Sequence, residues 1–399
     1  MTKLIDRDIS AAADIIKSGG LVAVPTETVY GLAGNGLDEA AVERIYEVKG
    51  RPAVKPLSLM VADKSAMELY CENVPEAAYA LADKFWPGPL TIVLKAKNIV
   101  PEIVRAGGST VGLRCPDHPM TLELLHRSGL PFAAPSANPS DLPSPKNAQQ
   151  VMDYFDGMID CVIDGGDCGI GRESTIIDMS QKPYRILRQG ALPEEEIKSA
   201  LKEAMNIVGI TGPTGCGKTT ALNVLRDFGG LTLDCDAVYH QLLAESEQLI
   251  SELDEAFPGT VKKGKLDRKA LAALVFNDET ELEKLNRISH AHISEEIEKR
   301  LSEWAMQGGG IAALDAIELI GSGISKRCDM VLAVLSDKSI RAKRIMARDG
   351  IDEEAAWLRI NAQKEDEYFI SNCDYVLYNN GTENEFRDSV LNLLLEVLK

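Results

Sequence analysis

One short run in the middle of the chain limits what this protein can fold into more than any other. Residues 212–219 read Gly-Pro-Thr-Gly-Cys-Gly-Lys-Thr and match the phosphate-binding pattern G-x-x-x-x-G-K-[ST]. A short apolar strand is predicted before the run, over residues 206–211, and a helix after it, over residues 220–226. The pattern requires this context, which disfavours the alternative of a glycine-rich turn that fits by accident.

Each part of this run has a physical role in binding the phosphates of ATP. Its glycines let successive backbone N–H groups turn toward phosphate oxygens, and the N-terminus of the following helix favours anions. The Lys218 side chain can reach the outer phosphates, and the Thr219 hydroxyl is placed to bind Mg²⁺. The predicted ATP contacts are Gly212, Pro213, Thr214, Gly215, Cys216, Gly217, Lys218, Thr219 and Thr220.

The position of the loop predicts two domains. Such a loop normally follows the first strand of its domain, yet here about half of the 399 residues precede it and need a fold of their own. A polar helix that begins with a proline is predicted over residues 193–204, as at a domain end or linker. We therefore predict domains over residues 1–204 and 205–399, with the boundary near Met205.

Composition excludes several classes of protein. The net charge of −18 disfavours a protein that coats nucleic acid non-specifically. The eight cysteines form no C-x-x-C pair, which fits a reducing cytosol better than a disulfide framework or a zinc site. The first residues lack an apolar signal core, and no stretch is long enough to span a bilayer. We expect a cytoplasmic protein that does not bind membranes.

Both halves are predicted to have an α/β fold, but with different sheets. In the first half, strands and helices mix without a regular alternation, which favours a mixed sheet. Its strands are expected at residues 21–25, 57–61, 90–94 and 175–177, and its helices at 39–48 and 65–70. The second half alternates regularly, as in a P-loop kinase with a parallel sheet. Its strands are expected at residues 207–210, 231–233, 310–314, 330–335 and 375–378, and its amphipathic helices include 282–300 and 338–346.

Small polar residues and isolated cations follow the predicted strands throughout the first half. The runs are residues 25–32, 49–57, 86–91, 111–116, 134–140, 173–178 and 187–190. Hydroxyls, a carboxylate and a phenol directly after a strand are costly to bury unless they bond to something. The set suits one anionic ligand held from several loops. Taken singly, each run is more often a turn with solvated surface cations.

Taken in order, these runs resemble the YrdC family of threonylcarbamoyl-AMP synthases over residues 5–192. The resemblance implies that L-threonine, bicarbonate and ATP are joined into threonylcarbamoyl-adenylate, with release of pyrophosphate. That product supplies the N6-threonylcarbamoyl group of adenosine 37 in tRNAs that read ANN codons. Negative charge crowds together when threonine carbamate attacks the α-phosphate, so preorganised cations are expected.

The resemblance also implies the residues of this site. Lys49, Arg51 and Lys55 are expected to hold the ATP phosphates, Lys49 and Arg51 as catalytic residues, with further nucleotide contacts from Thr110, Ser136, Ser144 and Arg188. Threonine would be bound by Thr28, Arg114, Ala134 and Ser174, with Arg114 pairing to its carboxylate. No general base stands out, so positioning and charge stabilisation are expected to carry the reaction.

The first half departs from its family at two positions. Lys55 stands where many relatives have Asn, and Met60 where many have His. The first change keeps a hydrogen-bond donor, and the second weakens any contact expected at that position. Longer members continue into an extra domain, in whose place a different domain follows here.

Charged residues of the second half suit phosphoryl transfer. Residues 233–238 are predicted as a strand ending in two alternate carboxylates, Asp234 and Asp236, which would share one side of an extended segment. One could accept a proton from an attacking hydroxyl or orient Mg²⁺, and helix capping is the alternative. Arg341, Arg344 and Arg348 recur along one predicted helix, either as a solvated face or as a lid over the phosphoryl group.

This set resembles dephospho-coenzyme A kinase over residues 206–395. The resemblance implies transfer of the ATP γ-phosphoryl group to the ribose 3′-hydroxyl of dephospho-CoA. Asp236 would then be the catalytic base, Lys218 and Arg348 would stabilise charge, and Asn380 would border the adenine site. The chain departs from the family at residues 290–291 and in the acceptor-lining region at residues 315–321. The acceptor is therefore less constrained than phosphoryl transfer itself.

We therefore expect a bifunctional enzyme with two independent ATP sites, with Mg²⁺ as activator and no tightly bound organic cofactor. The expected partners are L-threonine, bicarbonate, ATP and dephospho-CoA, with transient contact to tRNA-modification proteins. The sequence does not indicate an oligomeric state. Two alternatives remain: an RNA- or nucleotide-binding module fused to a degraded kinase, and a kinase whose acceptor is another nucleoside or nucleotide.

Overall fold

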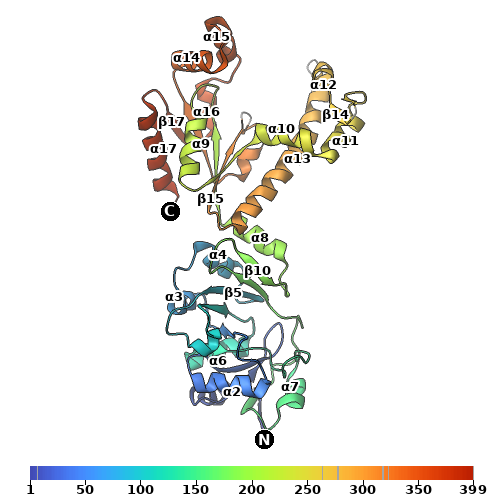
Figure 1. Cartoon of the computed structure of the whole chain (residues 1–399), viewed down its shortest axis with the longest axis vertical. Coiled ribbons are helices and arrows are strands. Elements are labelled where there is room, and N and C mark those ends of the chain that lie inside the picture. The colour runs from blue at the N-terminus through green and yellow to red at the C-terminus, as the bar shows by residue number, and fades with distance from the viewer. Residues whose placement is uncertain (7, 263, 276–277, 317–318, 322, 399) are drawn as a thin grey trace. The chain divides into compact units, whose positions relative to one another are not determined.

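The chain separates into two compact units (Figure 1). The computed structural model describes residues 1–6, 8–262, 264–275, 278–316, 319–321 and 323–398. The first unit comprises Met1–Ala204 with Met306–Gly308, and the second comprises Met205–Ala305 with Gly309–Lys399. Each unit has its own sheet and its own buried core.

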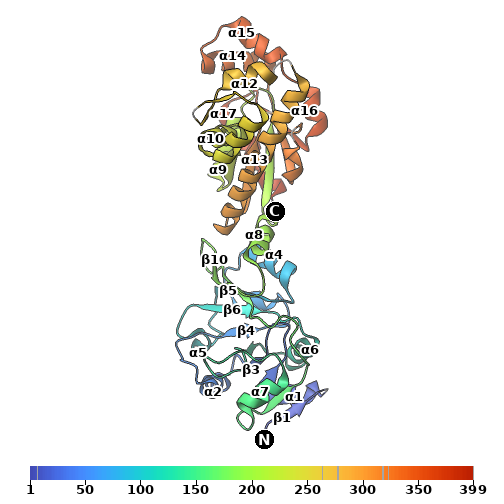
Figure 2. The ribbon, with the colours of Figure 1, turned by 90° about the vertical axis from the view of Figure 1, so that its right-hand side faces the viewer.

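The first unit is built on a ten-stranded mixed sheet. The strand order is β1-β8-β2-β3-β7-β4-β6-β5-β9-β10, and Figure 2 shows β3, β4, β6 and β5 following one another across the unit. The sheet contains parallel pairs, such as β4 with β6, and antiparallel pairs, such as β5 with β6. This confirms the predicted mixed sheet. The strands are β1 (Lys3–Ile5), β2 (Val22–Val24), β3 (Gly31–Asn35), β4 (Ser58–Met60), β5 (Leu90–Lys95), β6 (Thr110–Arg114), β7 (Phe132–Ala133), β8 (Cys161–Ile163), β9 (Thr175–Asp178) and β10 (Arg185–Arg188).

Capping residues set the ends of α2 in the first unit. In α2, the Asp38 carboxylate accepts from the Ala40 N–H at the start, and Gly50 adopts a left-handed conformation (φ 57°) at the end. The chain therefore turns at Gly50, between Lys49 at the end of the helix and Arg51 in the loop that follows. The helices are α1 (Ile9–Lys17), α2 (Glu39–Lys49), α3 (Ala66–Tyr70), α4 (Glu76–Phe85), α5 (Glu102–Arg105), α6 (Pro119–Ser128), α7 (Ala148–Phe155) and α8 (Glu194–Glu203).

The core of the first unit lies between α1, α6 and the sheet. Ile9, Ala12 and Ile16 recur at helical spacing on α1 and pack in one cluster with Val22 and Val24 of β2. These side chains are almost completely removed from water. Because β2 is fixed in this way, the polar residues that follow it are held at a defined place in the fold.

The second unit is built on a five-stranded, all-parallel sheet, as the sequence predicted. The order is β12-β15-β11-β16-β17, so the strand that enters the glycine-rich loop is central. The strands are β11 (Asn206–Thr211), β12 (Leu231–Asp234), β15 (Ile311–Asp315), β16 (Met330–Leu335) and β17 (Tyr375–Tyr378), with a separate hairpin of β13 (Val261–Lys262) and β14 (Lys265–Leu266). All five carboxyl ends therefore meet at one edge, where α/β proteins bind ligands.

Helices α9 and α17 pack together with the sheet of the second unit (Figure 1). Leu222 and Leu225 of α9 join Phe386 and Val390 of α17 and Ile210 of β11 in one buried cluster. The helices are α9 (Lys218–Asp227), α10 (Cys235–Glu245), α11 (Glu247–Ala256), α12 (Arg268–Val275), α13 (Glu279–Met306), α14 (Lys338–Asp349), α15 (Glu353–Asn361), α16 (Asp366–Asn372) and α17 (Glu383–Val397), with a 3₁₀ turn at η1 (Ile324–Arg327).

Candidate functional site

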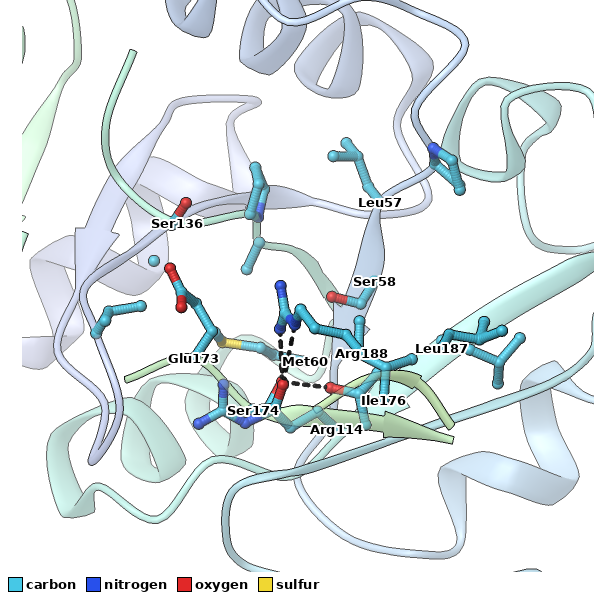
Figure 3. Close-up of a pocket in the computed structure, with 18 of the residues that line it drawn as sticks. Leu57, Ser58, Met60, Arg114, Ser136, Glu173, Ser174, Ile176, Leu187 and Arg188 are labelled. Atoms are coloured by element: carbon cyan, nitrogen blue, oxygen red, sulfur yellow. Dashed lines mark hydrogen bonds between the residues drawn. The ribbon is translucent and has the colours of Figure 1, made fainter. Parts of the chain in front are cut away.

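The first unit has an open cavity of about 310 Å³, lined by residues of β3, β4, β5, β6, β9 and β10 and of the adjoining loops. Residues predicted to bind ATP or threonine contribute much of its lining: Arg51, Thr110, Arg114, Ala134, Ser136, Ser174 and Arg188. Figure 3 shows Arg188 and Ser174 joined by hydrogen bonds, with Arg114 and Glu173 beside them. The fold thus gathers side chains that are far apart in the sequence around one space.

Arg114 is the last residue of β6 and is only 7% exposed. Its Nη2 donates to Thr28 Oγ1 at 2.7 Å and to Glu27 Oε1 at 2.8 Å, and its Nε donates to the Gly88 carbonyl at 3.3 Å. Among the described residues, Nη1 has no hydrogen-bond partner. This nitrogen is therefore the part of the guanidinium group that can pair with a ligand carboxylate.

Glu27 is part of this site, although the sequence did not single it out as a site residue. Its Oε1 pairs with Arg114, while its Oε2 accepts from the Asp117 N–H at 3.0 Å. The sequence feature that could have identified Glu27 is its place directly after a strand. A carboxylate that is largely buried there needs a partner. Thr28 lies behind the lining and reaches the cavity through Arg114.

Ser174 joins two strands and an arginine at the cavity wall. Its hydroxyl lies 2.8 Å from Thr91 Oγ1 on β5, and Arg188 Nη2 donates to it at 3.2 Å. Arg188 also donates from Nη2 to the Ser174 carbonyl at 2.9 Å. Loss of solvation lowers the pKa of the Arg188 guanidinium. The arginine is thereby held in place before any ligand arrives.

Ser144 is connected to the cavity through Glu173. The Ser144 hydroxyl donates to Glu173 Oε1 at 2.7 Å, and Glu173 lines the cavity while Ser144 does not. This hydrogen bond is the main cause that lowers the pKa of the Glu173 carboxyl, and the cations Arg188 and Arg172 contribute further. The cavity therefore contains one carboxylate among its cations, which the sequence did not predict.

The three cations predicted on the ATP phosphates lie in different surroundings. Arg51 lines the cavity, and its Nη2 donates to the Pro56 carbonyl at 2.9 Å. Lys49 is 3% exposed and donates from Nζ to the carbonyls of Ser136 and Asn138, and its burial lowers the pKa of the amine to about 7. Lys49 thus supports the cavity wall from behind, and Lys55 is exposed outside the lining.

The glycine-rich loop of the second unit connects β11 to α9. Gly217 has φ +105°, and a Cβ atom there would lie 2.1 Å from Asn379 Nδ2. Lys218 is the first residue of α9, and its Nζ donates to the Gly212 carbonyl at 3.0 Å across the loop. Thr219 follows in the first turn of α9 and is exposed, and Thr220 is half-buried. The loop thus has the strand and the helix that its pattern requires.

The expectation that Asp234 and Asp236 project from one extended strand is wrong. Strand β12 ends at Asp234, and α10 begins at Cys235. Asp234 Oδ1 caps this helix by accepting from the N–H groups of Asp236 and Ala237 at 2.9 and 3.0 Å. The capping alternative therefore holds for Asp234, because its short side chain satisfies the free amides of α10. Asp236 lies in the first turn of α10, and desolvation raises the pKa of its carboxyl.

A third carboxylate, Asp315, lies at the same sheet edge. Its Cα pairs with that of Asp234 on β12 and with that of Ile210 on β11. Its Oδ1 is buried and has no hydrogen-bond partner among the described residues, and burial raises the pKa of its carboxyl to about 6. The sequence noted Asp315 only within a departure from the family pattern, of which residues 317–318 lie outside the described residues.

Two arginines of α14, Arg341 and Arg344, contact the glycine-rich loop. Arg341 is 1% exposed, and its Nε donates to the Thr214 carbonyl at 3.0 Å. Arg344 Nη1 lies 3.4 Å from the carbonyls of Gly215 and Cys216. Arginines of α14 therefore bind the outward-facing carbonyls of the glycine-rich loop. The sequence did not predict these two contacts, because residue spacing does not reveal what a helix packs against.

Arg348 and Asn380 are both exposed. Arg348 makes a bidentate pair with Asp349, from Nε at 2.7 Å and from Nη2 at 3.0 Å. Asn380 exchanges hydrogen bonds with Asp337. The neighbouring Asn379 is 4% exposed and donates to the Cys216 carbonyl at 2.8 Å. Of these two asparagines, Asn379 therefore contacts the loop.

No cluster of three or more His, Cys, Asp or Glu side chains among the described residues could hold a metal ion. None of the described helices combines the length and the apolar composition needed to cross a membrane.

Two family models match the chain, one in each unit. The model described as telomere recombination, for Sua5, YciO and YrdC, matches residues 14–190. The dephospho-CoA kinase model matches residues 206–385.

Individual relatives match one unit each. A threonylcarbamoyl-AMP synthase from Pyrococcus abyssi is 50% identical over 195 residues, covering 49% of this chain and 57% of the relative. A shorter protein from Methanocaldococcus jannaschii named for the same activity is 38% identical over 182 residues, covering 46% of this chain and 85% of the relative. A dephospho-CoA kinase from Corynebacterium glutamicum is 33% identical over 193 residues, covering 48% of this chain and 96% of the relative.

A solved structure of P. abyssi Sua5 complexed with L-threonine is 29% identical, covers 84% of this chain and 100% of its own, and has a TM-score of 0.49. The chain spans little more than half the length of the Pyrococcus relative that it matches. Through residues 14–190 the chain belongs to the Sua5/YciO/YrdC family, and through residues 206–385 it belongs to the dephospho-CoA kinase family.

Proposed function

We propose that the chain is a bifunctional enzyme with one ATP-dependent activity in each unit. The first unit, residues 1–204, converts L-threonine, bicarbonate and ATP into threonylcarbamoyl-AMP, pyrophosphate and water. The water leaves when the threonine amine and bicarbonate form the carbamate, N-carboxythreonine. The second unit, residues 205–399, phosphorylates the ribose 3′-hydroxyl of dephospho-CoA. Family membership of both units supports the pairing, since members of both families are named as enzymes.

One observation carries the first activity: Arg114 and Arg188 are held at one cavity by bonds to the protein before any ligand arrives. Arg114 Nη1 binds the threonine carboxylate, with Thr28 and Ser174 fixing the surroundings. Arg51 and Arg188 face the ATP phosphates, while Lys49 holds the carbonyl of Ser136 from behind. The cations need no reorganisation as charge develops, so they stabilise the transition state.

The synthase step is a displacement at the α-phosphorus. A carbamate oxygen of N-carboxythreonine forms the new P–O bond, and the bond to the bridging oxygen breaks, so that the β- and γ-phosphates leave as pyrophosphate. No proton is transferred in this step, so the cations of the cavity are sufficient for it and no general base is needed. Glu27 pairs with Arg114, and the charge of Glu173 stabilises that of Arg188. The two arginines, in turn, contact the substrates.

For the kinase, the glycine-rich loop and Lys218 bind the β- and γ-phosphates of ATP. Mg²⁺ fits this edge of the sheet, because Thr219 offers an exposed hydroxyl in the first turn of α9 and Asp315 has a buried oxygen without a partner. When bound, this ion neutralises charge on the phosphate oxygens. Asp236 accepts the proton of the ribose 3′-hydroxyl. The 3′-oxygen then bonds to the γ-phosphorus, and the bond from that phosphorus to the β–γ bridging oxygen breaks, so that ADP leaves. Lys218 and Arg348 stabilise the transferring group.

Two assays on the intact chain test the proposal. Pyrophosphate release that needs both L-threonine and bicarbonate is expected, and it should fall on Arg114→Ala but not on Lys218→Ala. Formation of CoA and ADP from dephospho-CoA and ATP should show the reverse dependence. If purified chain released no pyrophosphate yet retained structured RNA at physiological salt, the first unit would instead be a binding module.

The alternative for the kinase is that its acceptor is another nucleoside or nucleotide instead of dephospho-CoA. The resemblance to dephospho-CoA kinases implies that residues 315–321, where this chain departs from the family pattern, line the acceptor. A panel of nucleosides, nucleotides and dephospho-CoA, read by coupled ADP formation, distinguishes the two. Dephospho-CoA should have the highest kcat/KM, and a faster nucleoside or nucleotide would replace it as the acceptor.

A further inference from the structure

Gln363 connects two parts of the second unit that are far apart in sequence. It lies between α15 (Glu353–Asn361) and α16 (Asp366–Asn372), and its amide contacts the glycine-rich loop. Its Oε1 accepts from the Thr214 N–H at 2.9 Å, and its Nε2 donates to Thr214 Oγ1 at 2.7 Å. One side chain thus bonds both the backbone and the side chain of a loop residue.

Arg341 completes this arrangement from α14. Its Nη2 donates to Gln363 Oε1 at 2.8 Å, and its Nε donates to the Thr214 carbonyl at 3.0 Å. The N–H, the carbonyl and the hydroxyl of Thr214 are therefore all bonded by one arginine–glutamine pair. Arg341 is almost fully buried, so its charge has little access to water and depends on these acceptors.

The helices that present this pair form one packed element. Ala342 and Ile345 of α14 bury against Ala356 and Ile360 of α15. Gln363 follows α15 directly, while Arg348 lies in the last turn of α14. A movement of this helix pair would therefore displace Gln363 and Arg348 together. The bond from Gln363 to Thr214 ties that movement to the loop.

We propose that Gln363 is a positioning residue that couples the shape of the phosphate-binding loop to the placement of Arg348. It acts through Thr214 and Arg341 and does not contact the nucleotide. The coupling rests on the proposed phosphoryl transfer for its catalytic consequence, but the tether itself is a property of the ligand-free protein. Nucleotide in the loop then favours the helix-pair position that presents Arg348, and the reverse also holds because such coupling is reciprocal.

Three variants isolate the tether. Gln363→Ala removes all three bonds, whereas Gln363→Glu keeps both accepted bonds, and the Thr214 hydroxyl can turn to donate to the carboxylate. Lys364→Ala is the matched control, because Lys364 is the exposed neighbour and its Nζ faces Tyr368, away from the loop. All three are made in the full chain.

The first readout is hydrogen exchange in nucleotide-free protein, followed by mass spectrometry on the peptide containing residues 212–219. Gln363→Ala should raise exchange at the Thr214 amide about tenfold, with peptides from β11 and β16 unchanged as a check on folding. Gln363→Glu and Lys364→Ala should match the parent chain. Unchanged exchange in Gln363→Ala would overturn the tether, and this measurement does not depend on which acceptor the kinase uses.

The second readout is kinase kinetics. Gln363→Ala should raise the KM for ATP about tenfold and lower kcat several-fold, with the KM for the acceptor unchanged, and Gln363→Glu should restore most of the loss. In an Arg348→Ala background, the kcat loss from Gln363→Ala should shrink toward onefold, because the two residues act through one element. Fully additive losses would refute the coupling even where the tether itself is confirmed. Absence of kinase activity in the parent chain would count against the proposed function, while the exchange result would still decide the tether.

Discussion

The two anion sites that we propose, one in each unit, are built in opposite ways. In the second unit, residues 212–219 are consecutive, and backbone geometry makes the site. In the first unit, the lining runs from Val29 to Arg188, and its cations meet only when segments far apart in the sequence fold into one sheet. A contiguous backbone site depends on a few conformations that cannot be replaced. A dispersed side-chain site should lose activity in smaller steps, because each residue contributes separately.

The largest effect is expected at Gly217. A methyl group there would collide with Asn379 Nδ2 at 2.1 Å, at a backbone conformation that disfavours alanine. Gly217→Ala should lower the kinase kcat/KM about 100-fold or more, since displacement of a reacting group by about 1 Å has that cost. Threonine-dependent pyrophosphate release should not change. Gly229→Ala is the matched control, because Gly229 also has a positive φ but open space around its Cα.

In the first unit, Arg114→Lys is expected to have the next largest effect. Lysine cannot reproduce the bonds to Thr28, Glu27 and Gly88 and still present a nitrogen to the ligand. The KM for L-threonine should rise about 10- to 100-fold, which corresponds to loss of a charge-assisted hydrogen bond. The KM for ATP should stay within about threefold. Arg127→Lys, in a surface pair with Glu123, should leave both constants unchanged.

Asp315→Asn should separate stability from activity in the second unit. The folded protein holds the Asp315 proton more tightly than the unfolded chain, so the cost of ionising this carboxyl is absent below about pH 4 and complete above about pH 6. The substitution should therefore stabilise the protein by roughly 1–3 kcal/mol at pH 7.5 and by less at pH 4.5. Kinase activity should fall.

Scanning calorimetry of the intact chain at both pH values measures this difference, with the exposed Asp254→Asn as control. A loss of stability at pH 7.5 would mean that the carboxylate has a stabilising partner in solution.

The smallest effect is expected at Lys55, whose side chain is exposed outside the cavity lining. Lys55→Ala should raise the KM for ATP in pyrophosphate release only about two- to fivefold, because an exposed charge is screened by water and salt. The loss should disappear as ionic strength rises. A 100-fold loss would show that the dispersed site also contains an irreplaceable cation and would break the contrast between the two units.

The sequence predicted the second unit's architecture well because its signals are local. The strand before the loop, the loop and the helix after it follow from consecutive residues, and β11, β16 and β17 begin and end where expected, within one residue. The prediction failed where chain direction changes. Asp236 was expected in an extended strand, but Asp234 caps α10, and no periodicity separates a strand end from a helix start across three residues.

Contacts between distant segments were beyond what spacing can reveal. Three such contacts are the Glu27–Arg114 pair, the Lys49 contact with Ser136 and the Gln363 contact with Thr214, whose residues are 87, 87 and 149 positions apart. The resemblance to a family predicted which residues form the first site. It did not reveal that Lys49 supports the wall while Arg51 lines the cavity.

The order of strands has a consequence for how the protein forms during synthesis. Lys3 of β1 pairs with Cys161 of β8. The central β11 pairs with β15, which follows it by about 100 residues in the chain. Neither sheet can be completed until nearly all of its unit has left the ribosome, so β11 emerges as an apolar segment without neighbours. Slow folding and a need for protection of the nascent chain are expected from such long-range pairing.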